Sequence, residues 1–507
     1  MNQIIFKRSI TLIGLVYLLF LLLVIVFRYI VLLKFGFAYT DSDQTIMWFG
    51  LKEYAEGVFH EPRFYGQSYN SMLEALIVVP LYKFGIPAHK CLPFVTSAMA
   101  LFPYIIISLF TFFKKSKEMA VVIISIPLLL PVEYSLITTI PRGFVTGIFI
   151  TSFGCIFLFY PKSKWSFLIL SFAGVLGFSV NSNSTLLFLP CIMYLFLENL
   201  KNKQFYLYTS IGLILGFSIH FLSNYFYILH PFYDLHKMEL FYSFEAIVKG
   251  IKKLDIFFND VTPVFWDKGF LVLFMFLILG FLLLRKKDYV KAFTVIVIPI
   301  IIIFTLGISK VHDGTNRIFY SYSRMYLTVP VLLGVSLSFF NVKNSKLLFA
   351  YLILPVVFLI CQIYSLDSAI KLALSPSNDD KVAIATIDVF NDKCNHLNNI
   401  CKTYKVELVI IINDPSCDFY NYGCAVSLSD FPKTLRPPYE RRTWRLLEDE
   451  KKVYKNILIV DITRNPLTNA DIVKEIPNES GLFLLENNMR CVGDLLIELP
   501  IPCRPYK

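Results

Sequence analysis

The sequence predicts an α-helical polytopic membrane protein of about eleven spans with a C-terminal extracytoplasmic α/β domain. Three observations favour this fold class. The 507 residues are 56% hydrophobic and only 17% charged, whereas a soluble chain carries roughly 25% charged residues. Apolar runs of about 16–25 residues, long enough to cross a bilayer, recur up to residue 366. Beyond that point the composition becomes that of a soluble domain.

The first apolar run, Ile10 to Leu33, is expected to remain as a span. It follows Lys7 and Arg8, as a secretory signal would. It is too long for a signal peptide's apolar region, and no small-x-small cleavage pattern follows it. We therefore expect a membrane domain over 1–366 and a soluble domain over 367–507.

The formal net charge of +11 sits in short clusters between the apolar runs. This pattern is typical of cytoplasmic loops, so the charge sets topology and predicts no nucleic-acid partner. The clusters are Lys114/Lys115/Lys117, Lys162/Lys164, Lys201/Lys203, Arg285/Lys286/Lys287 and Lys343/Lys346. With these inside, the N-terminus is cytoplasmic and the outward segments are 35–90, 133–142, 181–184, 229–266, 310–323 and everything after about 367.

Three apolar stretches of the chain are short for membrane spans. The stretch Ser71–Gly85 is short and contains Glu74, Pro80 and Lys83, so we expect a half-inserted or in-plane helix that does not cross the membrane. The runs 165–180 and 185–200 are short for spans and are interpreted as a shallow hairpin. The expected location is a bacterial inner membrane, with the C-terminal domain periplasmic or extracellular.

The C-terminal domain is predicted to be mixed α/β. Strands are expected at Lys381–Phe390, Val406–Asn413, Asn456–Ile462 and Gly481–Leu485, with a charged helix from Tyr439 to Tyr454. All six cysteines of this domain are expected to form disulfides, because an even set in one soluble domain is typical of an oxidising compartment. The expected local pairs are Cys394–Cys401, Cys417–Cys424 and Cys491–Cys503. A zinc site is the alternative, but no Cys-x-x-Cys pair occurs and only His396 is nearby.

Two carboxylates, Asp41 and Asp43, follow the first span directly. At a membrane surface they can act as a general base or bind a divalent cation. The competing interpretation is structural, with Ser42 or Asp43 capping the next helix. From Gln44 to Val58 the residues Met47, Leu51, Tyr54 and Val58 recur at helical spacing, which predicts an amphipathic helix in the membrane surface.

After this helix come Tyr65-Gly66-Gln67 and Tyr69, and then Leu73-Glu74-Ala75. In this order, the elements of residues 39–85 resemble the first extracytoplasmic segment of the GT-C superfamily of membrane glycosyltransferases. That superfamily includes protein O-mannosyltransferases and lipid A aminoarabinose transferases. The many-span topology extends the resemblance loosely to residue 366.

The resemblance implies transfer of a sugar from a polyprenyl-phosphate carrier to an extracytoplasmic lipid, glycan or protein. It also implies that a first-loop acid acts as base or orients the acceptor. Asp43 matches the family aspartate by position, with Asp41 as second choice. Gln44 stands where relatives often have Glu, which departs from the paired-acid pattern. Tyr65, Gln67, Tyr69 and Glu74 are the implied substrate-binding residues of this loop.

A phosphate-bearing donor requires outward basic groups, and the loop 310–324 supplies them. Arginine forks bind phosphate oxygens, and aromatic rings can stack on a sugar. The alternative is that these arginines extend to lipid headgroups. The candidates are His312, Asp313, Arg317, Tyr320 and Arg324, with Arg142 at another outward helix end.

The long outward loop predicts a second interfacial helix within Phe241–Leu254, with its lysines toward anionic headgroups. Two other functions are kept as alternatives. A transporter or flippase of lipid-linked glycans predicts polar residues at mid-span and an internal repeat. A glycan polymerase or ligase predicts its main site in a large late loop.

Overall fold

The computed structural model describes residues 2–67, 70–233, 240–342, 344–375, 384–413, 419–437, 442–461, 473–487 and 490–497. The chain forms two compact units. The first comprises Met1–Gly36, Pro93–Leu222 and Met238–Asp379, and the second comprises Phe37–Leu92, Ser223–Lys237 and Asp380–Lys507. The units differ from the division expected at residue 366. The last boundary lies at residue 379, and the segments Phe37–Leu92 and Ser223–Lys237 belong to the same unit as the C-terminal domain.

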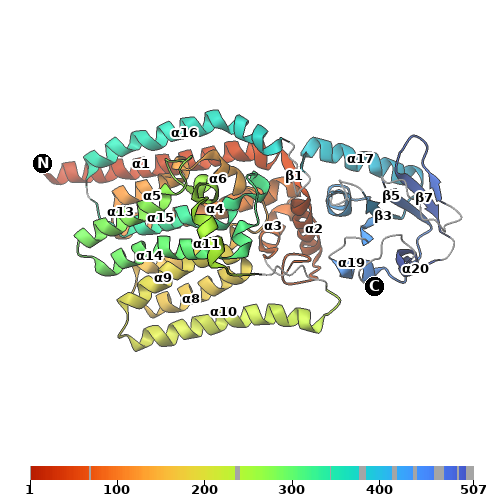
Figure 1. Ribbon diagram of the computed structural model, residues 1–507. Coiled ribbons are helices and arrows are strands. Elements are labelled where there is room, and N and C mark those ends of the chain that lie inside the picture. The colour runs from red at the N-terminus through yellow and green to blue at the C-terminus, as the bar shows by residue number, and fades with distance from the viewer. Residues whose placement is uncertain are drawn as a thin grey trace. The chain divides into compact units, whose positions relative to one another are not determined.

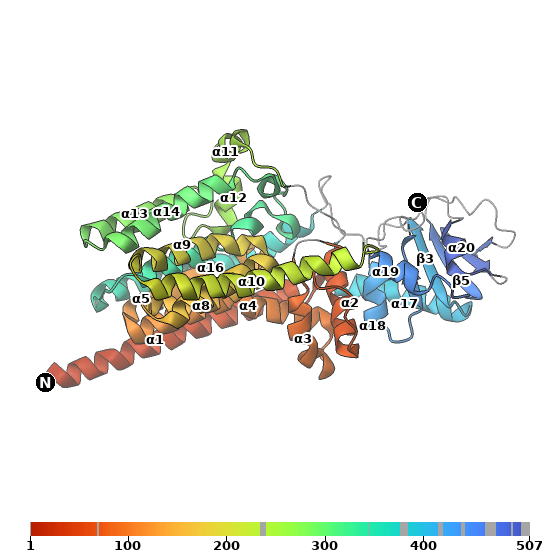
Figure 2. The same ribbon diagram turned by 90° about the horizontal axis from the view of Figure 1, so that it is seen from below.

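The first unit is helical, and its long helices run alongside one another, with α16 beside α1 (Figure 1; Figure 2). Its longer helices are α1 (Asn2–Val31), α4 (Ala88–Lys114), α5 (Lys117–Leu129), α7 (Thr146–Cys155), α8 (Lys164–Val180), α9 (Thr185–Glu198), α10 (Lys203–Leu229), α13 (Leu271–Arg285), α14 (Tyr289–Thr305), α15 (Val329–Ser338) and α16 (Ser345–Leu374). Shorter elements join them: η1 (Leu32–Gly36), α6 (Val132–Ile137), η2 (Ile156–Phe159), η3 (Ser182–Ser184), α11 (Phe244–Ile251), α12 (Leu254–Phe258), η4 (Asn259–Val261), η5 (Ser309–His312), η6 (Ile318–Tyr320) and η7 (Tyr322–Tyr326).

Four helical segments among the described residues are long and apolar enough to cross a bilayer. They are Leu12–Gly36, Ala88–Lys114, Lys203–Leu229 and Leu348–Leu374. Five shorter apolar helical segments accompany them: Thr146–Phe159, Lys164–Val180, Ser182–Glu198, Leu271–Arg285 and Tyr289–Thr305. The chain is therefore a helical membrane protein.

The short apolar stretches of the sequence form short helices. The stretch Ser71–Gly85 contains one helix, α3 (Leu73–Lys83), of 11 residues. At 1.5 Å per residue this is roughly 16 Å, about half the hydrocarbon thickness. The runs 165–180 and 185–200 form the antiparallel pair α8 and α9, joined by the polar turn 181–184.

Close helix packing in the first unit depends on glycine where α7 meets α8. A Cβ at Gly147 would lie 2.8 Å from the carbonyl oxygens of both Gly177 and Asn181. Without a side chain there, the two backbones approach each other, as small residues allow in membrane helices. This contact brings the turn 181–184 close to Gly143 and Phe144, which precede α7.

The second unit contains a mixed five-stranded sheet in the order β4-β3-β5-β7-β6. Its strands are β3 (Leu408–Asn413), β4 (Lys433–Leu435), β5 (Asn456–Asp461), β6 (Val473–Glu475) and β7 (Leu482–Glu486). β3 pairs in parallel with β4 and β5, whereas β7 pairs antiparallel with β5 and β6. Side chains of β3 alternate between two buried faces, Leu408 and Ile410 on one and Val409 and Ile411 on the other. A strand buried on both faces explains the continuous apolar run.

Helices cover both faces of this sheet, as an α/β domain requires. α19 (Thr443–Glu448) and α20 (Val492–Ile497) supply Leu446 and Leu495 to one face. α17 (Ile387–Thr403) supplies Leu397 and Ile400 to the other. The predicted strands at 406–413, 456–462 and 481–485 are confirmed, while the two edge strands were not predicted.

Two predicted elements were wrong in extent. Within the expected strand Lys381–Phe390, only β2 (Ile384–Thr386) is extended, because the Thr386 hydroxyl accepts from the Val389 N–H and starts α17. β2 pairs with β1 (Tyr39–Asp41) and lies outside the main sheet. The expected helix 439–454 is limited to the six residues of α19. Residues 381–383 and 438–441 lie outside the described part.

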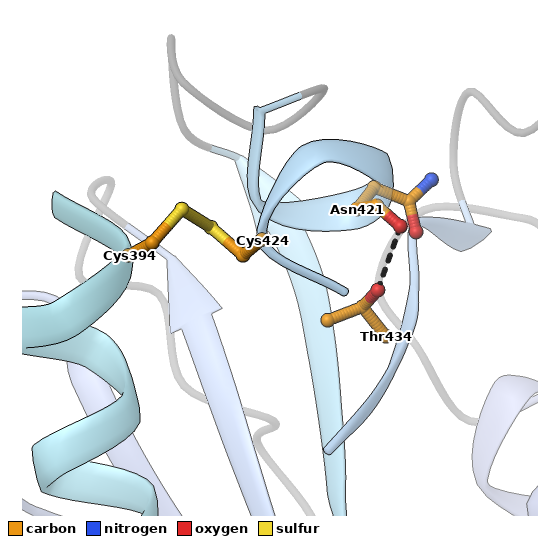
Figure 3. The surroundings of a disulfide bond; sticks show 4 residues. All are labelled: Cys394, Asn421, Cys424 and Thr434. Carbon is orange, nitrogen blue, oxygen red and sulfur yellow. Dashed lines mark hydrogen bonds between the residues drawn. A yellow bond between two sulfur atoms is a disulfide. The ribbon is translucent and has the colours of Figure 1, made fainter. Parts of the chain in front are cut away.

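The disulfide in the described part joins Cys394 of α17 to Cys424 at the end of η8 (Phe419–Cys424), with a Cα–Cα distance of 5.3 Å (Figure 3). The predicted pairs Cys394–Cys401 and Cys417–Cys424 are therefore wrong. Cys401 lies on the same helix as Cys394 and is buried with a free thiol. Cys417 and Cys503 lie outside the described residues, so the predicted pair Cys491–Cys503 also falls outside the described part.

The bond closes a loop across 30 positions and fixes η8 beside α17. On its other side, η8 packs against α2 (Ser42–Glu56), where a Cβ at Gly423 would come within 2.9 Å of the Thr45 side chain. In Figure 3 the neighbouring Thr434 hydroxyl donates to the Asn421 carbonyl oxygen at 2.8 Å and ties η8 to β4.

Non-reducing peptide mapping should recover Cys394 linked to Cys424, and Cys401 should react with alkylating reagents only after unfolding. The variant Cys394→Ser should lower the free energy of unfolding by about 3 kcal/mol, because the unfolded chain gains loop entropy. Cys401→Ser, a buried thiol that forms no bridge, is the matched control. A peptide joining Cys394 to Cys401 would contradict this assignment.

Candidate functional site

The helix α2 is capped by Asp41 and not by Ser42 or Asp43, which corrects the sequence interpretation. One Asp41 oxygen accepts from the backbone N–H groups of Asp43 (2.9 Å) and Gln44 (3.1 Å), and the other accepts from the Gln44 side-chain amide at 2.5 Å. Asp41 is fully buried, and extended backbone at this position presents its carboxylate to the helix end. Capping is therefore assigned to Asp41. Asp43 lies in the first helical turn and is partly exposed.

The sequence predicted that the apolar stripe of α2 lies in the membrane surface. Met47 and Leu51 of this stripe instead pack inside the second unit, whereas Val58 is 40% exposed. Met47 and Leu51 are fully buried, and Trp48 packs edge-on against Phe390 of α17 with ring centroids 5.3 Å apart. The helix itself is confirmed, and it ends where Gly57 adopts the left-handed conformation (φ 82°).

The predicted first-loop residues have different environments. Tyr65 is fully buried, and its hydroxyl donates to Glu53 at 3.4 Å. Glu74 is fully buried in the first turn of α3. Gly66 adopts the left-handed conformation of a tight turn, with φ 76°. Gln67 closes that turn through its N–H to Phe64 O at 2.8 Å, and Tyr69 lies outside the described residues.

Glu61, which the sequence analysis missed, is a buried acid of this loop that accepts three hydrogen bonds. Its Oε1 accepts from the Trp444 indole (3.1 Å) and the Gly66 N–H (3.1 Å), and its Oε2 accepts from the Tyr227 hydroxyl (3.0 Å). The side chain is 1% exposed. It thereby joins three segments of the second unit that are distant in sequence, the first loop, the end of α10 and α19.

Burial raises the pKa of Glu61 to about 7, although the three hydrogen bonds and the Arg442 charge act in the opposite direction. Next to it, the His60 ring stacks on Trp444 with centroids 3.6 Å apart, and its Nε2 is 2.7 Å from a Glu53 oxygen. The Arg442 Nε donates to the Tyr65 carbonyl at 3.1 Å. With a pKa of about 7, the Glu61 carboxyl can exchange a proton near neutral pH.

In the first unit, Arg324 organises the late loop. Its Nη1 donates to the carbonyls of Tyr320 (3.1 Å) and Ser321 (2.8 Å), and its Nη2 donates to Asp313 O. The guanidinium also lies 3.9 Å from the centre of the Tyr320 ring, while the Tyr320 hydroxyl donates to the Asp313 carboxylate at 2.6 Å. Arg324 is 4% exposed, so it does not extend to lipid headgroups.

The other predicted basic residues also bond to backbone. Arg317 Nη1 donates to Leu372 O and to the Ser375 hydroxyl (2.7 Å), at the end of α16. Arg142 Nη1 donates to Phe319 O within the late loop. An imidazole nitrogen of His312 lies 2.7 Å from the Leu306 carbonyl. Arg142 thus contacts the loop 313–324.

Two more groups complete the late-loop cluster, which we define as Arg142, Asn183, Asp260, Lys310, Asp313, Tyr320, Ser321 and Arg324. Burial and the nearby Arg324 charge lower the pKa of Lys310 to about 8. The Ser321 hydroxyl donates to Asp260 at 2.7 Å, and burial raises the pKa of that carboxyl. The cluster thus contains three cationic side chains, Arg142, Lys310 and Arg324, in buried surroundings.

Asn183 and Arg28 were also missed as structural contributors. The Asn183 amide donates to Phe144 O (2.7 Å) and to Arg324 O (3.5 Å), which joins the α8–α9 turn to the late loop. Arg28 interrupts an apolar span, and its Nη1 donates to Ser135 O (2.8 Å) and Thr138 Oγ1 (2.7 Å). An arginine inside an apolar run is a signal that the sequence offers directly.

The candidate residues therefore fall into two groups. Asp41, Asp43, Tyr65, Gln67 and Glu74 belong to the second unit, and Arg142 and the late-loop residues belong to the first. No cluster of three or more His, Cys, Asp or Glu side chains in the described part could hold a metal ion. Comparison with protein-family models, curated proteins and solved structures finds no match for this chain.

Glu61 makes stability depend on pH. Because its folded pKa lies above the ordinary value of 4.5, the folded state gains from protonation below pH 4.5 and loses that gain as pH rises to about 7. The full difference is about 3 kcal/mol. Glu61→Gln stays neutral and keeps the acceptor for Trp444 and Gly66, so its melting temperature should fall less between pH 5 and pH 8 than that of the wild type.

Thermal unfolding of the purified full-length protein, followed across this pH range, measures the difference. Glu56→Gln, at the exposed end of α2, is the control and should reproduce the wild-type slope. Parallel curves for the wild type and Glu61→Gln would show that Glu61 does not titrate in this range.

Proposed function

We propose that this chain is a membrane glycosyltransferase of the GT-C kind that uses a polyprenyl-phosphate-linked sugar as donor. The acceptor is an extracytoplasmic lipid, glycan or protein. The observation that carries the proposal is the late-loop cluster, where a membrane-embedded unit gathers Arg142, Lys310 and Arg324 around one loop. A lipid phosphate at a membrane surface is the anion that such a cluster suits.

The proposed reaction is a single displacement. The Asp43 carboxylate takes the proton of an acceptor hydroxyl, whose oxygen bonds to the anomeric carbon of the sugar. The bond from that carbon to the phosphate oxygen breaks, and the polyprenyl phosphate leaves with the electron pair. The cations of the late loop stabilise the negative charge that develops on the leaving phosphate.

The position of Asp43 supports its role as base. Since Asp41 already provides the cap of α2, catalysis and capping are assigned to different carboxylates. Asp43 is partly exposed, and a carboxylate that acts as general base must be accessible to the substrate from which it takes a proton. Asp41, fully buried, is the weaker candidate.

The eleven-span topology is part of the proposal. Each proposed span connects a basic segment with an outward segment, so that the direction of crossing alternates along the chain. The eleven spans are α1, α4, α5, α7, α8, α9, α10, α13, α14, α15 and α16. An odd number of crossings places the C-terminal domain opposite the cytoplasm, where the Cys394–Cys424 disulfide is stable. The proposed location is the inner membrane of a bacterium.

Accessible cysteines introduced singly should test this topology with a membrane-impermeant reagent. Cells should label at Asn316 and at Val453 of the C-terminal domain, and should not label at Lys114 or Lys286, all four being exposed positions. Permeabilised cells should label at every position, which controls for reactivity. Labelling of Lys114 in intact cells would overturn the proposed parity.

The activity test is turnover of lipid-linked sugars by the full-length protein in liposomes, with a panel of polyprenyl-phosphate sugars and acceptors. Asp43→Asn should lower the rate by roughly 10²–10⁴, the usual cost of losing a general base. Asp388→Asn is the matched control, because Asp388 occupies the first turn of α17 in the same unit and is exposed. Its rate should equal that of the wild type.

Two outcomes would contradict the proposal. Full activity in Asp43→Asn would eliminate Asp43 as base. Movement of intact lipid-linked sugar across the bilayer without transfer would assign the chain to transport instead.

A further inference from the structure

The short helix α11 (Phe244–Ile251) has three chemically different faces. One face packs within the first unit: Ile247 is buried, and Gly250 lies close enough to Leu306 that an added Cβ would be 3.0 Å from its side chain. Leu306 follows directly on the apolar helix α14. This contact fixes α11 across the end of that helix.

The second face is apolar and exposed. Phe244, Val248 and Ile251 are spaced at i, i+4 and i+7, which places them on one side of the helix. They are 72%, 54% and 45% exposed. Leu240 and Phe241, just before the helix, are each 64% exposed.

The third face and the C-terminal end of the helix, where Lys252 is the cap and Lys253 follows it, are charged and predominantly basic. Lys249, Lys252 and Lys253 are exposed, and Glu245 pairs with Lys249 at 2.7 Å. Three lysines and one glutamate leave a net charge of +2 on this side. An apolar face beside a lysine-rich face is typical of a helix that lies in a membrane surface.

The neighbouring helix α14 indicates whether lipid or a protein partner covers the apolar face of α11. On α14, one of the shorter apolar helices, Ile300 and Phe304 are 48% and 52% exposed. In the proposed topology α14 is a span, and these side chains face lipid. α11 packs against that same helix. A bilayer covers both surfaces at once, whereas a protein partner seated on α11 would also have to displace lipid from α14.

The helix is also bonded to the start of the late loop. The Ser243 N–H donates to Gly307 O and the Ser309 N–H donates to Phe241 O, both at 2.9 Å. These bonds flank the bridge between Tyr242 and Ile308. Lys310, the first cation of the late-loop cluster, follows one residue later.

We propose that α11 is immersed in the outward lipid leaflet, with Phe244, Val248 and Ile251 among acyl chains and Lys249, Lys252 and Lys253 on anionic phospholipid headgroups. The lipid surface thereby holds the segment 307–309 from which the late loop begins. This inference rests on the proposed topology but not on the proposed reaction, because it needs no turnover to test.

Photocrosslinking in proteoliposomes tests the lipid contact. The full-length protein carries p-benzoylphenylalanine at one position and is reconstituted with phosphatidylcholine and phosphatidylglycerol. Mass spectrometry should find phospholipid adducts at positions 244 and 248. Position 353 on α16, 68% exposed within a span, is the positive control, and position 453 in the C-terminal domain, 54% exposed, is the negative control.

The headgroup contact is tested by the composition of the adducts. At position 248, phosphatidylglycerol should be enriched about threefold over its share of the bilayer, because each lysine near the surface attracts anionic lipid. The triple variant with Lys249, Lys252 and Lys253 changed to Gln should return this ratio to that of the bilayer. The same change at Lys405, Lys451 and Lys455, exposed in the second unit, removes equal charge and should leave the ratio unchanged.

Three results would overturn the inference. Adducts at 353 without adducts at 244 and 248 would place α11 outside the lipid. Crosslinked dimers at 244 would assign the apolar face to a second copy of the chain. An unchanged phosphatidylglycerol ratio in the lysine-to-glutamine variant would remove the anionic-headgroup contact.

Discussion

Hydrogen bonds from side chains to backbone carbonyls hold the first unit together where its helices end. An apolar environment offers no water to satisfy these carbonyls, so each needs a donor from the protein. Arg28 serves the end of α6, Gln362 bonds to Leu128 O at 2.7 Å beside the end of α5, and Arg324 bonds to three carbonyls of the late loop. These donors allow irregular backbone to exist inside a membrane unit, and irregular backbone is where the candidate residues lie.

The second unit depends on a different kind of contact, in which one buried acid joins distant segments. Glu61 accepts from Trp444, 383 positions away, and from Tyr227 at the end of α10. The Cys394–Cys424 bridge fixes η8 beside α17, and the other side of η8 packs against α2. The first outward loop is thus built into the C-terminal domain, so a change in that domain can reach Asp43 through α2.

Local chemistry was predictable from the sequence, and distant pairing was not. The run Val406–Asn413 predicted a buried strand because both faces of β3 are covered. The helix after Asp41 was predicted too, but its cap was misplaced by one or two residues, since Asp41, Ser42 and Asp43 all suit that role. The environment of Glu61 and the partner of Cys394 follow from contacts between segments far apart in the chain, and periodicity contains no information about those.

The arginines of the late-loop cluster use their N–H groups to bond backbone carbonyls, whereas their charge remains available to attract an anion. A guanidinium that donates to a carbonyl keeps its full positive charge, because the carbonyl is neutral. Within the late-loop cluster, Arg142, Lys310 and Arg324 give three positive charges against Asp260 and Asp313. The arginines can therefore attract a phosphate by their charge without forming bidentate hydrogen bonds to it. Burial and the Arg324 charge lower the pKa of Lys310 to about 8, and a negative charge arriving beside it would raise that pKa and stabilise its protonated form.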